Sequence, residues 1–277
     1  MIEEKKIAIL IDADNTSPEY MKIVIEEAAK EGIITYRRVY GDFTKQQLKS
    51  WTKEILNEYA LSPIHSYDYT TGKNSTDITM VIDAMDILYT GHADVFCLVT
   101  TDSDFTRLTT KLREAGKKVI GMGQQKTVGA FVKACNSFKY LDLITKATKD
   151  EKPNTTKEQK QKQVAVGKGK KDNKDSVETK EVITKGKSAK EASEKAPIKV
   201  DKTKLPEDIR QSIIDIIDEY TDAEGWTLVS KIGDLLPKQY PDFDTRNYGF
   251  KRMINFLEAE GFKIKVKEDK STYVVKK

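Results

Sequence analysis

Carboxylates follow two apolar runs of the sequence, in the segments LIDADN and LVTTDSDF. Residues two apart in an extended chain face the same side, so Asp12 with Asp14 and Asp102 with Asp104 can each offer a pair. Asp77, which follows the loop DYTTGKNST, is a third acidic position. At about 4 Å and an effective dielectric constant of about 20, like charges repel by about 4 kcal/mol, and a hard cation removes that cost. The pattern predicts a site for Mg²⁺ or Mn²⁺.

The surrounding sequence alternates between strand-like and helix-like runs. Such alternation predicts a mostly parallel, three-layer α/β sheet with right-handed crossovers. Ligands of these sheets bind beyond the carboxyl ends of the strands, where the acids fall. The strand-like runs are KIAILI, ITYRRVY, LSPIHSY, DVFCLVTT and KKVIGMG, and the helical ones follow Pro18 and span KQQLKSWTKEILNEY, TDITMVIDAMDILYTG, DFTRLTTKLREAG and VGAFVKAC.

Local structure alone accounts for some of these acids. Ser17 and Pro18 are typical of a helix start, so the first helix does not need Asp12 as a cap. Asp14 fits an Asx turn, and Asp104 fits the cap of a later helix. Asp12 is therefore the acid that local structure explains least.

Weaker candidates lie near the same strand ends. Thr101 could orient water or a phosphate beside Asp102, and Lys73 could neutralise a phosphate. Asp83 lies about 240° around the predicted helix from Asp77, so the two share a site only if Asp77 lies at or before the first turn. We place Asp83, Asp14, Thr101 and Lys73 in a second tier.

Three motifs, LIDADN, GKNSTDITMVIDAM and LVTTDSDFTRL, resemble the NYN domain in its LabA-like branch, within the PIN-like nuclease superfamily. The resemblance covers residues 5 to 145. It implies a PIN-like fold and a metal-dependent ribonuclease, with Ser103 where the family often carries glycine. The acidic cluster maps onto Asp12, Asp77, Asp102 and Asp104, with Asn15 as the accompanying amide.

The chemistry that this resemblance implies is phosphodiester hydrolysis. Carboxylates would hold one or two Mg²⁺ or Mn²⁺ ions, which lower the pKa of a bound water and stabilise the attacking and leaving oxygens. Asp12 and Asp102 are expected as direct ligands, with Asp77 and Asp104 binding directly or through water. A different class also fits the first motif, because haloacid-dehalogenase-like phosphatases begin DxDx[T/V] and use the first aspartate, here Asp12, as a covalent nucleophile.

The excess positive charge of the chain lies in its middle. Residues 146–204 carry 18 Lys and Arg against 10 Asp and Glu, whereas residues 1–145 and 205–277 are each slightly acidic. The middle segment contains no aromatic residue and no apolar periodicity, so we expect a disordered linker whose ends average about 40 Å apart. Its lysines are either a solvated spacer or a weak electrostatic contact to nucleic acid.

Residues 205–277 read as three helices followed by a two-stranded wing with its turn at 268–270, a small winged-helix domain of α+β class. The segment VSKIGDLLPKQYPDFDTRNYGFKRMINFLEAEGFKI resembles the OST-HTH or LOTUS domain, and that family's association with RNA implies RNA as the substrate class. The expected RNA-binding residues, at the start of the third helix, are Arg246, Asn247, Tyr248, Lys251 and Arg252. Winged helices also bind proteins, so a non-catalytic RNA-binding or regulatory adaptor remains the main alternative to an endoribonuclease.

The sequence also bears on compartment. No apolar run approaches the roughly 18 residues that span a bilayer, and the N-terminus is too acidic for a signal peptide. We therefore expect a cytoplasmic protein without a membrane contact. Cys97 and Cys135 lie in apolar segments without metal-type spacing, which indicates reduced core residues.

Overall fold

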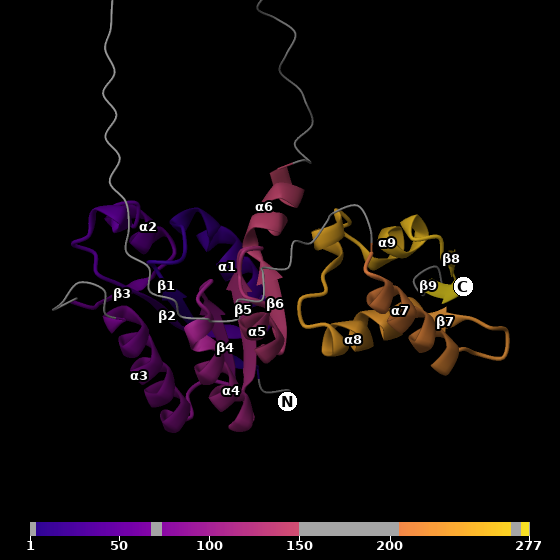
Figure 1. The fold of residues 1–277 in the computed structure, drawn as a ribbon, viewed down its shortest axis with the longest axis horizontal. Coiled ribbons are helices and arrows are strands. Elements are labelled where there is room, and N and C mark those ends of the chain that lie inside the picture. Colours follow the sequence, from indigo (N-terminus) through magenta and orange to yellow (C-terminus); the bar gives the residue numbers. More distant parts are fainter. Residues whose placement is uncertain (1–3, 68–73, 150–204, 267–272, 277) are drawn as a thin grey trace, which may run out of the picture. The chain divides into compact units, whose positions relative to one another are not determined.

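A six-stranded sheet forms the centre of the N-terminal unit in the computed structural model, which describes residues 4–67, 74–149, 205–266 and 273–276. The strand order is β3-β2-β1-β4-β5-β6, and every neighbouring pair is parallel (Figure 1). The predicted parallel α/β sheet is thereby confirmed. The strands are β1 (Lys6–Asp12), β2 (Ile33–Gly41), β3 (Ser62–His65), β4 (Val95–Val99), β5 (Lys118–Gly123) and β6 (Ser137–Tyr140).

Helices cover both faces of the sheet, which gives three layers (Figure 1). Alternate residues of β1 divide between two cores, as the period of a strand requires. Ala8 and Leu10 belong to the core that includes α3, α4 and α5, whereas Ile7 and Ile9 belong to the core of α1 and α6. The helices are α1 (Met21–Ala29), α2 (Lys53–Glu58), α3 (Ser75–Thr90), α4 (Thr106–Glu114), α5 (Gly129–Ala134) and α6 (Leu141–Lys149).

Three local expectations differ from the structure. The single helix expected over 45–59 is divided into the 3₁₀ helix η2 (Gln46–Leu48) and α2, because Thr52 adopts an extended N-cap conformation and accepts a hydrogen bond from the backbone N–H of Ile55 at 3.5 Å. Strand β6 was not expected, since its four residues are too few to show a clear period. Helix α6 continues to Lys149, beyond the expected start of the linker at 146. Residues 150–204 lie outside the described ranges.

The C-terminal unit contains helices and a three-stranded antiparallel sheet of order β7-β9-β8. Its apolar core includes Ile213, Ile232 and Phe256. The third helix begins later than expected, because Gly249 adopts a left-handed conformation with φ 86° and separates a 3₁₀ turn from α9. The expected wing turn at 268–270 lies outside the described residues. The elements are α7 (Glu207–Glu219), β7 (Thr227–Leu228), α8 (Val229–Gln239), η4 (Thr245–Tyr248), α9 (Met253–Ala259), β8 (Lys263–Val266) and β9 (Tyr273–Lys276).

Two further expectations concern the cysteines and membranes. Cys97 and Cys135 are both buried and unpaired, and burial raises the pKa of each thiol. In the part of the chain that the structure describes, no helix combines the length and apolar character needed to span a membrane.

Gly123, at the end of β5, is a position where the fold has no room for a side chain. A Cβ atom there would lie 2.7 Å from the carbonyl oxygen of Thr100 and 2.7 Å from the hydroxyl of Thr127. We expect Gly123→Ala to lower the free energy of unfolding by about 1–3 kcal/mol, since an overpacked core must shift. Chemical denaturation measures this change.

The matched control is Gly233→Ala in α8, where an added Cβ meets no atom within 4 Å. Alanine is the better helix former by about 0.5–1 kcal/mol, so this variant should unfold at higher denaturant concentration. Equal stability of Gly123→Ala and the unaltered protein would contradict the close approach at the end of β5.

Candidate active site

The candidate acids meet where the strand order of the sheet reverses. Strand β1 has β2 on one side and β4 on the other, so the carboxyl ends of β1 and β4 flank this switch point. Asp12 is the last residue of β1, and Asp102 precedes η3 (Ser103–Phe105), which follows β4. Parallel sheets bind ligands at such a crevice.

Asp12 is fully buried, and each of its carboxylate oxygens accepts two hydrogen bonds. Oδ1 accepts the backbone N–H groups of Asp14 at 3.0 Å and Asn15 at 3.2 Å. Oδ2 accepts the side-chain amide of Asn15 at 2.8 Å and the hydroxyl of Thr100 at 2.7 Å. Burial nevertheless raises the pKa of Asp12, against the lowering effect of these donors.

The turn after β1 therefore has a local explanation that the sequence did not provide. Ser17 lies at the N-cap of η1 (Pro18–Tyr20), but its side chain makes no capping hydrogen bond. The carboxylate of Asp12, rather than that of Asp14, organises the turn by an Asx-type pair of bonds. The expectation that local structure leaves Asp12 unexplained was wrong.

Thr100 connects the two strand ends and was missed in the sequence, where Thr101 was chosen instead. The Thr100 hydroxyl donates to Asp12 and accepts the backbone N–H of Asp102 at 3.0 Å. Thr100 is fully buried, whereas Thr101 is half-buried. The sequence could not distinguish Thr100 from Thr101 by burial. All five residues of β4 are buried, so the strand shows no alternation between buried and exposed side chains.

Asp77, in the first turn of α3, has the electrostatic signature of a crowded acidic site. Its pKa is raised from its ordinary value of 3.8 to about 6, first by burial and then by the negative charges of Asp12, Asp102, Asp104 and Asp14. Acids from β1, α3 and the segment after β4 therefore lie within electrostatic reach of Asp77. Because each neighbour disfavours ionisation of Asp77, the cluster is held together against repulsion.

Asp14 fastens the first turn of α3 to this edge of the sheet. Its carboxylate accepts the hydroxyl of Thr76 at 3.1 Å and the side-chain amide of Gln47 at 3.3 Å, and the Lys45 ammonium lies 4.0 Å away. Thr76 immediately precedes Asp77. Asp14 thus positions Asp77 while its own charge is partly compensated.

The remaining candidates fall inside and outside the cluster. Asp102 accepts the backbone N–H of Asp104 at 2.9 Å and so caps η3 itself, while Asp104 is exposed. Asp83 has other partners: its carboxylate accepts hydrogen bonds from the guanidinium of Arg38 at 2.7 Å and from the hydroxyl of Tyr40 at 3.0 Å. Lys73 lies outside the described residues.

The chemistry of the donors fits a divalent cation, but their present spacing does not yet form a cage. All the donors are carboxylate oxygens, which suit Mg²⁺ and Mn²⁺. Across residues 4–67, 74–149, 205–266 and 273–276, no three acidic, histidine or cysteine side chains lie close enough to hold a metal ion.

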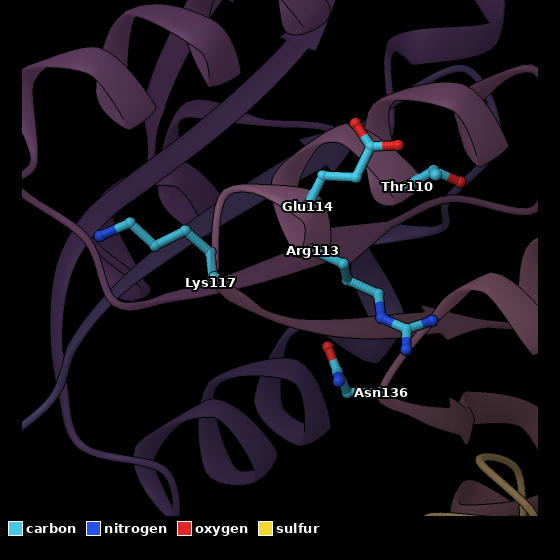
Figure 2. Close-up of a pocket in the computed structure, with 6 residues that line it drawn as sticks. Thr110, Arg113, Glu114, Lys117 and Asn136 are labelled. Carbon is cyan, nitrogen blue, oxygen red and sulfur yellow. The ribbon is translucent and has the colours of Figure 1, made fainter.

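A hollow of about 460 Å³ lies at the opposite end of the strands from the acids, beside the amino ends of β5 and β6. The carboxylate of Glu114, the guanidinium of Arg113 and the ammonium of Lys117 point away from one another there (Figure 2). Arg113 donates to the carbonyl of Ala134 at 2.7 Å, and Asn136 accepts the backbone N–H of Val119 at 2.8 Å. These groups serve the fold and converge on no common point.

Comparison with known families agrees with this arrangement. Residues 6–142 match the NYN domain family, and residues 204–273 match the OST-HTH/LOTUS domain family. The chain carries an NYN domain followed by an OST-HTH/LOTUS domain. NYN domains are of nuclease type, and OST-HTH/LOTUS domains are associated with RNA binding.

Individual relatives add little to the family assignment. The chain is 28% identical over 126 residues to the uncharacterized protein MJ0482 of Methanocaldococcus jannaschii, a match that covers 44% of this chain and 49% of that protein. The chain thus spans about half the length of this relative. A protein of unknown function from Vibrio parahaemolyticus, VPA0982, is 19% identical with a TM-score of 0.43, over 50% of this chain and 94% of that one. The WlbA dehydrogenase of Bordetella pertussis is 16% identical with a TM-score of 0.28, over 54% and 41% of the two chains.

In the OST-HTH/LOTUS domain, the expected RNA-binding residues divide into two groups. Arg246 donates to the Asp244 carboxylate through Nε at 2.9 Å and Nη2 at 2.7 Å, and Asn247 donates to the carbonyl of Asp242 at 2.8 Å. Their polar groups thus take part in the turn that contains η4. Tyr248 packs on Phe243 and Phe256, with ring centroids 6.0 and 5.4 Å away, and Lys251 and Arg252 are exposed just before α9.

Thr100 offers a direct test of how the acids are held. Thr100→Val removes a donor from Asp12 and an acceptor from the Asp102 N–H while keeping the shape of the side chain. We expect the free energy of unfolding to fall by about 1–3 kcal/mol, because buried polar groups lose their partners. Urea denaturation at neutral pH measures the change.

Thr109→Val is the matched control. Thr109 is fully buried, and its hydroxyl has no hydrogen-bond partner within the described residues. Removing that hydroxyl should leave the stability unchanged or raise it. A Thr100→Val variant no less stable than Thr109→Val would show that the hydroxyl of Thr100 does not hold the acids.

The raised pKa of Asp77 predicts a pH-dependent stability. The pKa of Asp77 is higher in the folded protein than in the unfolded chain. Its favourable contribution to the free energy of unfolding is therefore complete below about pH 4 and is lost as the pH rises through about 6. The shift corresponds to at most about 3 kcal/mol, which solvent screening reduces to about 1–2 kcal/mol at this half-buried side chain. Asp77→Asn should therefore unfold at higher temperature at neutral pH in EDTA, and gain nothing at acid pH.

Asp86→Asn controls for charge on the same helix, because Asp86 is exposed. Its unfolding temperature should follow that of the unaltered protein at every pH. A gain from Asp77→Asn that was equal at acid and neutral pH would refute repulsion among the acids as its cause.

Proposed function

We propose that the chain is a metal-dependent endoribonuclease whose acidic cluster hydrolyses RNA phosphodiesters. The single observation that carries this proposal is the convergence of acids from β1, α3 and the segment after β4, where burial and then the neighbouring negative charges raise the pKa of Asp77. A purely structural cluster would carry this repulsion without compensation. The NYN family assignment supports a nuclease, and it weighs against a phosphatase with Asp12 as nucleophile.

The members of the cluster that solvent can reach would hold Mg²⁺ or Mn²⁺. Asp77 and Asp102 are half-buried and Asp104 is exposed, whereas Asp12 has no exposed surface. Direct ligation by Asp12 would require it to release one of its four hydrogen bonds. When bound, a divalent cation lowers the pKa of a coordinated water and stabilises charge on the phosphate.

The other residues around the cluster have supporting roles. The side-chain amide of Asn15 and the hydroxyl of Thr100 both donate to Oδ2 of Asp12, so that its charge would stay in one place behind the reacting groups. Thr101, half-buried next to Asp102, would orient the attacking water or a phosphate oxygen. A preorganised arrangement of this kind needs no reorganisation during the reaction.

The OST-HTH/LOTUS domain would recruit RNA to the nuclease. Residues 150–204 connect the two domains, and a tether of this length would raise the local concentration of RNA at the nuclease domain. Lys251 and Arg252 are the exposed cations of the proposed RNA-binding set. Protein partners of this domain would suit the alternative, in which the chain binds RNA but cleaves nothing.

Incubation of the purified full chain with labelled RNA in Mn²⁺, Mg²⁺ or EDTA tests the proposal. We expect internal cleavage with either metal, none in EDTA, and a loss of about 100-fold or more in rate for Asp102→Asn and Asp12→Asn, because they remove charge at the reacting centre. Asp86→Asn is the matched control, since it removes an exposed carboxylate of α3, and it should cleave normally.

Two outcomes would refute the enzyme. Cleavage that persists unchanged in Asp102→Asn would come from a contaminating nuclease. RNA binding without cleavage under every metal condition would support the non-catalytic adaptor instead.

A further inference from the structure

The NYN and OST-HTH/LOTUS domains belong to one compact unit, and polar contacts join them. The NYN domain contributes β6, which is an edge strand because it ends the strand order of the sheet. The backbone N–H of Phe138 in β6 donates to the carbonyl oxygen of Pro241, before η4, at 2.7 Å. An edge strand leaves such N–H groups unpaired unless another segment covers them. The OST-HTH/LOTUS domain therefore satisfies a backbone donor at the edge of the sheet.

Two side chains of β6 add to this contact. The ammonium of Lys139 donates to the carboxylate of Asp244 at 2.8 Å, and the hydroxyl of Tyr140 donates to the carboxylate of Asp242 at 3.1 Å. The side chains of Lys139 and Asp244 are 23% and 11% exposed, so solvent screens this ion pair only in part. The segment 241–246 thus meets three successive residues of one strand.

Glu27 of α1 provides a second, buried contact. The guanidinium of Arg246 donates from Nη1 to Oε1 of Glu27 at 2.7 Å and from Nη2 to Oε2 at 3.0 Å. The side chain of Glu27 is 6% exposed, and Lys30 also pairs with it. Burial raises the pKa of Glu27, but hydrogen bonds from Arg246 and Lys30 outweigh burial and hold the pKa below its ordinary value. The carboxylate is therefore charged at neutral pH, with a partner in each domain.

Arg246 is also one of the residues expected to bind RNA. A guanidinium binds a carboxylate and a phosphate with the same two-point geometry. Glu27 occupies both terminal nitrogens of Arg246, and Asn247 of the expected set is 4% exposed. Resting on the proposed RNA-binding role of this domain, we propose that its η4 turn docks on β6 and Glu27 in a closed state. The Glu27 carboxylate then occupies the face of Arg246 that an RNA phosphate would bind, so RNA and the NYN domain compete for this turn.

The chemistry of the contact is suited to opening. Domain interfaces within a chain allow motion unless they are large and hydrophobic, and the contacts named above are hydrogen bonds and ion pairs. When the domains separate, Arg246 keeps Asp244 as a partner in its own domain, and Glu27 keeps Lys30. Neither charge is then left without a partner, so the open state is accessible. Rising salt should favour it, because ions screen the separating charges.

Energy transfer between two dyes measures the closed state in the absence of RNA. In the full chain, cysteines replace the exposed Lys133 of α5 and the exposed Lys238 of α8 and carry the dyes, while both native cysteines are buried. We expect efficient transfer at low salt. Glu27→Gln keeps the shape of the side chain but removes its charge, and it should lower the transfer efficiency, because Arg246 loses its ionic partner in the NYN domain.

Glu26→Gln is the matched control, since Glu26 is the exposed neighbour of Glu27 on α1 and its removal changes the net charge equally. Its transfer efficiency should equal that of the parent. Lys139→Gln removes the ion pair with Asp244 and should lower the transfer as Glu27→Gln does. Circular dichroism establishes that each variant is folded.

Binding of a fluorescein-labelled single-stranded RNA tests the competition, with EDTA present to exclude metal and cleavage. We expect Glu27→Gln without dyes to bind this RNA about 3- to 10-fold more tightly than the unaltered protein, because the apparent dissociation constant falls as the open fraction rises. Glu26→Gln should bind it as the unaltered protein does. Fluorescence anisotropy measures the three dissociation constants.

The outcomes separate docking, competition and the proposed nuclease. Equal transfer in the folded parent, Glu27→Gln and Lys139→Gln would overturn the docking. Lower transfer without tighter RNA binding, or an equal gain in Glu26→Gln, would overturn the competition, and RNA binding by none of these proteins would refute the RNA-binding role with it. Asp102→Asn, which tests the nuclease, should leave the transfer unchanged, so a loss of cleavage is distinguishable from a loss of docking.

Discussion

Repulsion among carboxylates is the constraint on which the rest of the N-terminal domain depends. Asp12, Asp77 and Asp102 come from β1, α3 and the segment after β4, and burial together with the neighbouring negative charges raises the pKa of Asp77 to about 6. A parallel sheet alone does not bring them together, because nothing in strand pairing attracts like charges. The arrangement persists because each acid is also a hydrogen-bond acceptor with a fixed place in the local backbone. Turn structure and charge clustering are thus two properties of the same side chains.

Those hydrogen bonds also divide the cluster into a buried and an accessible part. Asp12 uses all its acceptor capacity on Asp14, Asn15 and Thr100, and it has no exposed surface. Its negative charge still reaches Asp77, since electrostatic interaction is weakly screened below the surface. Asp77, Asp102 and Asp104 are the members that solvent can reach. Asp12 therefore contributes as a fixed charge even where it touches no ligand.

The sequence was sufficient for strands β1 to β5 of the parallel sheet and for the edge at which the acids fall, because apolar runs and strand ends are local signals. It did not identify Thr100, whose role depends on the register of β4 beside β1, nor Asp14 as the acceptor for Thr76 and Gln47. These contacts join residues that are far apart in the chain, and no spacing rule encodes them. The same limit applies to Asp83: helical geometry indicated a poor fit to the site, but its pairing with Arg38 required knowledge of the path of β2.

The loop 13–17 joins two features at the carboxyl ends of the strands. On one side it surrounds Asp12, and on the other it forms a wall of a hollow of about 320 Å³. Asn15 belongs to both, so a ligand that displaced its amide would also change the hydrogen bonding of Asp12. The four hydrogen bonds that hold Asp12 also reduce the entropy lost when a substrate reaches the acids, because this charge is already in place.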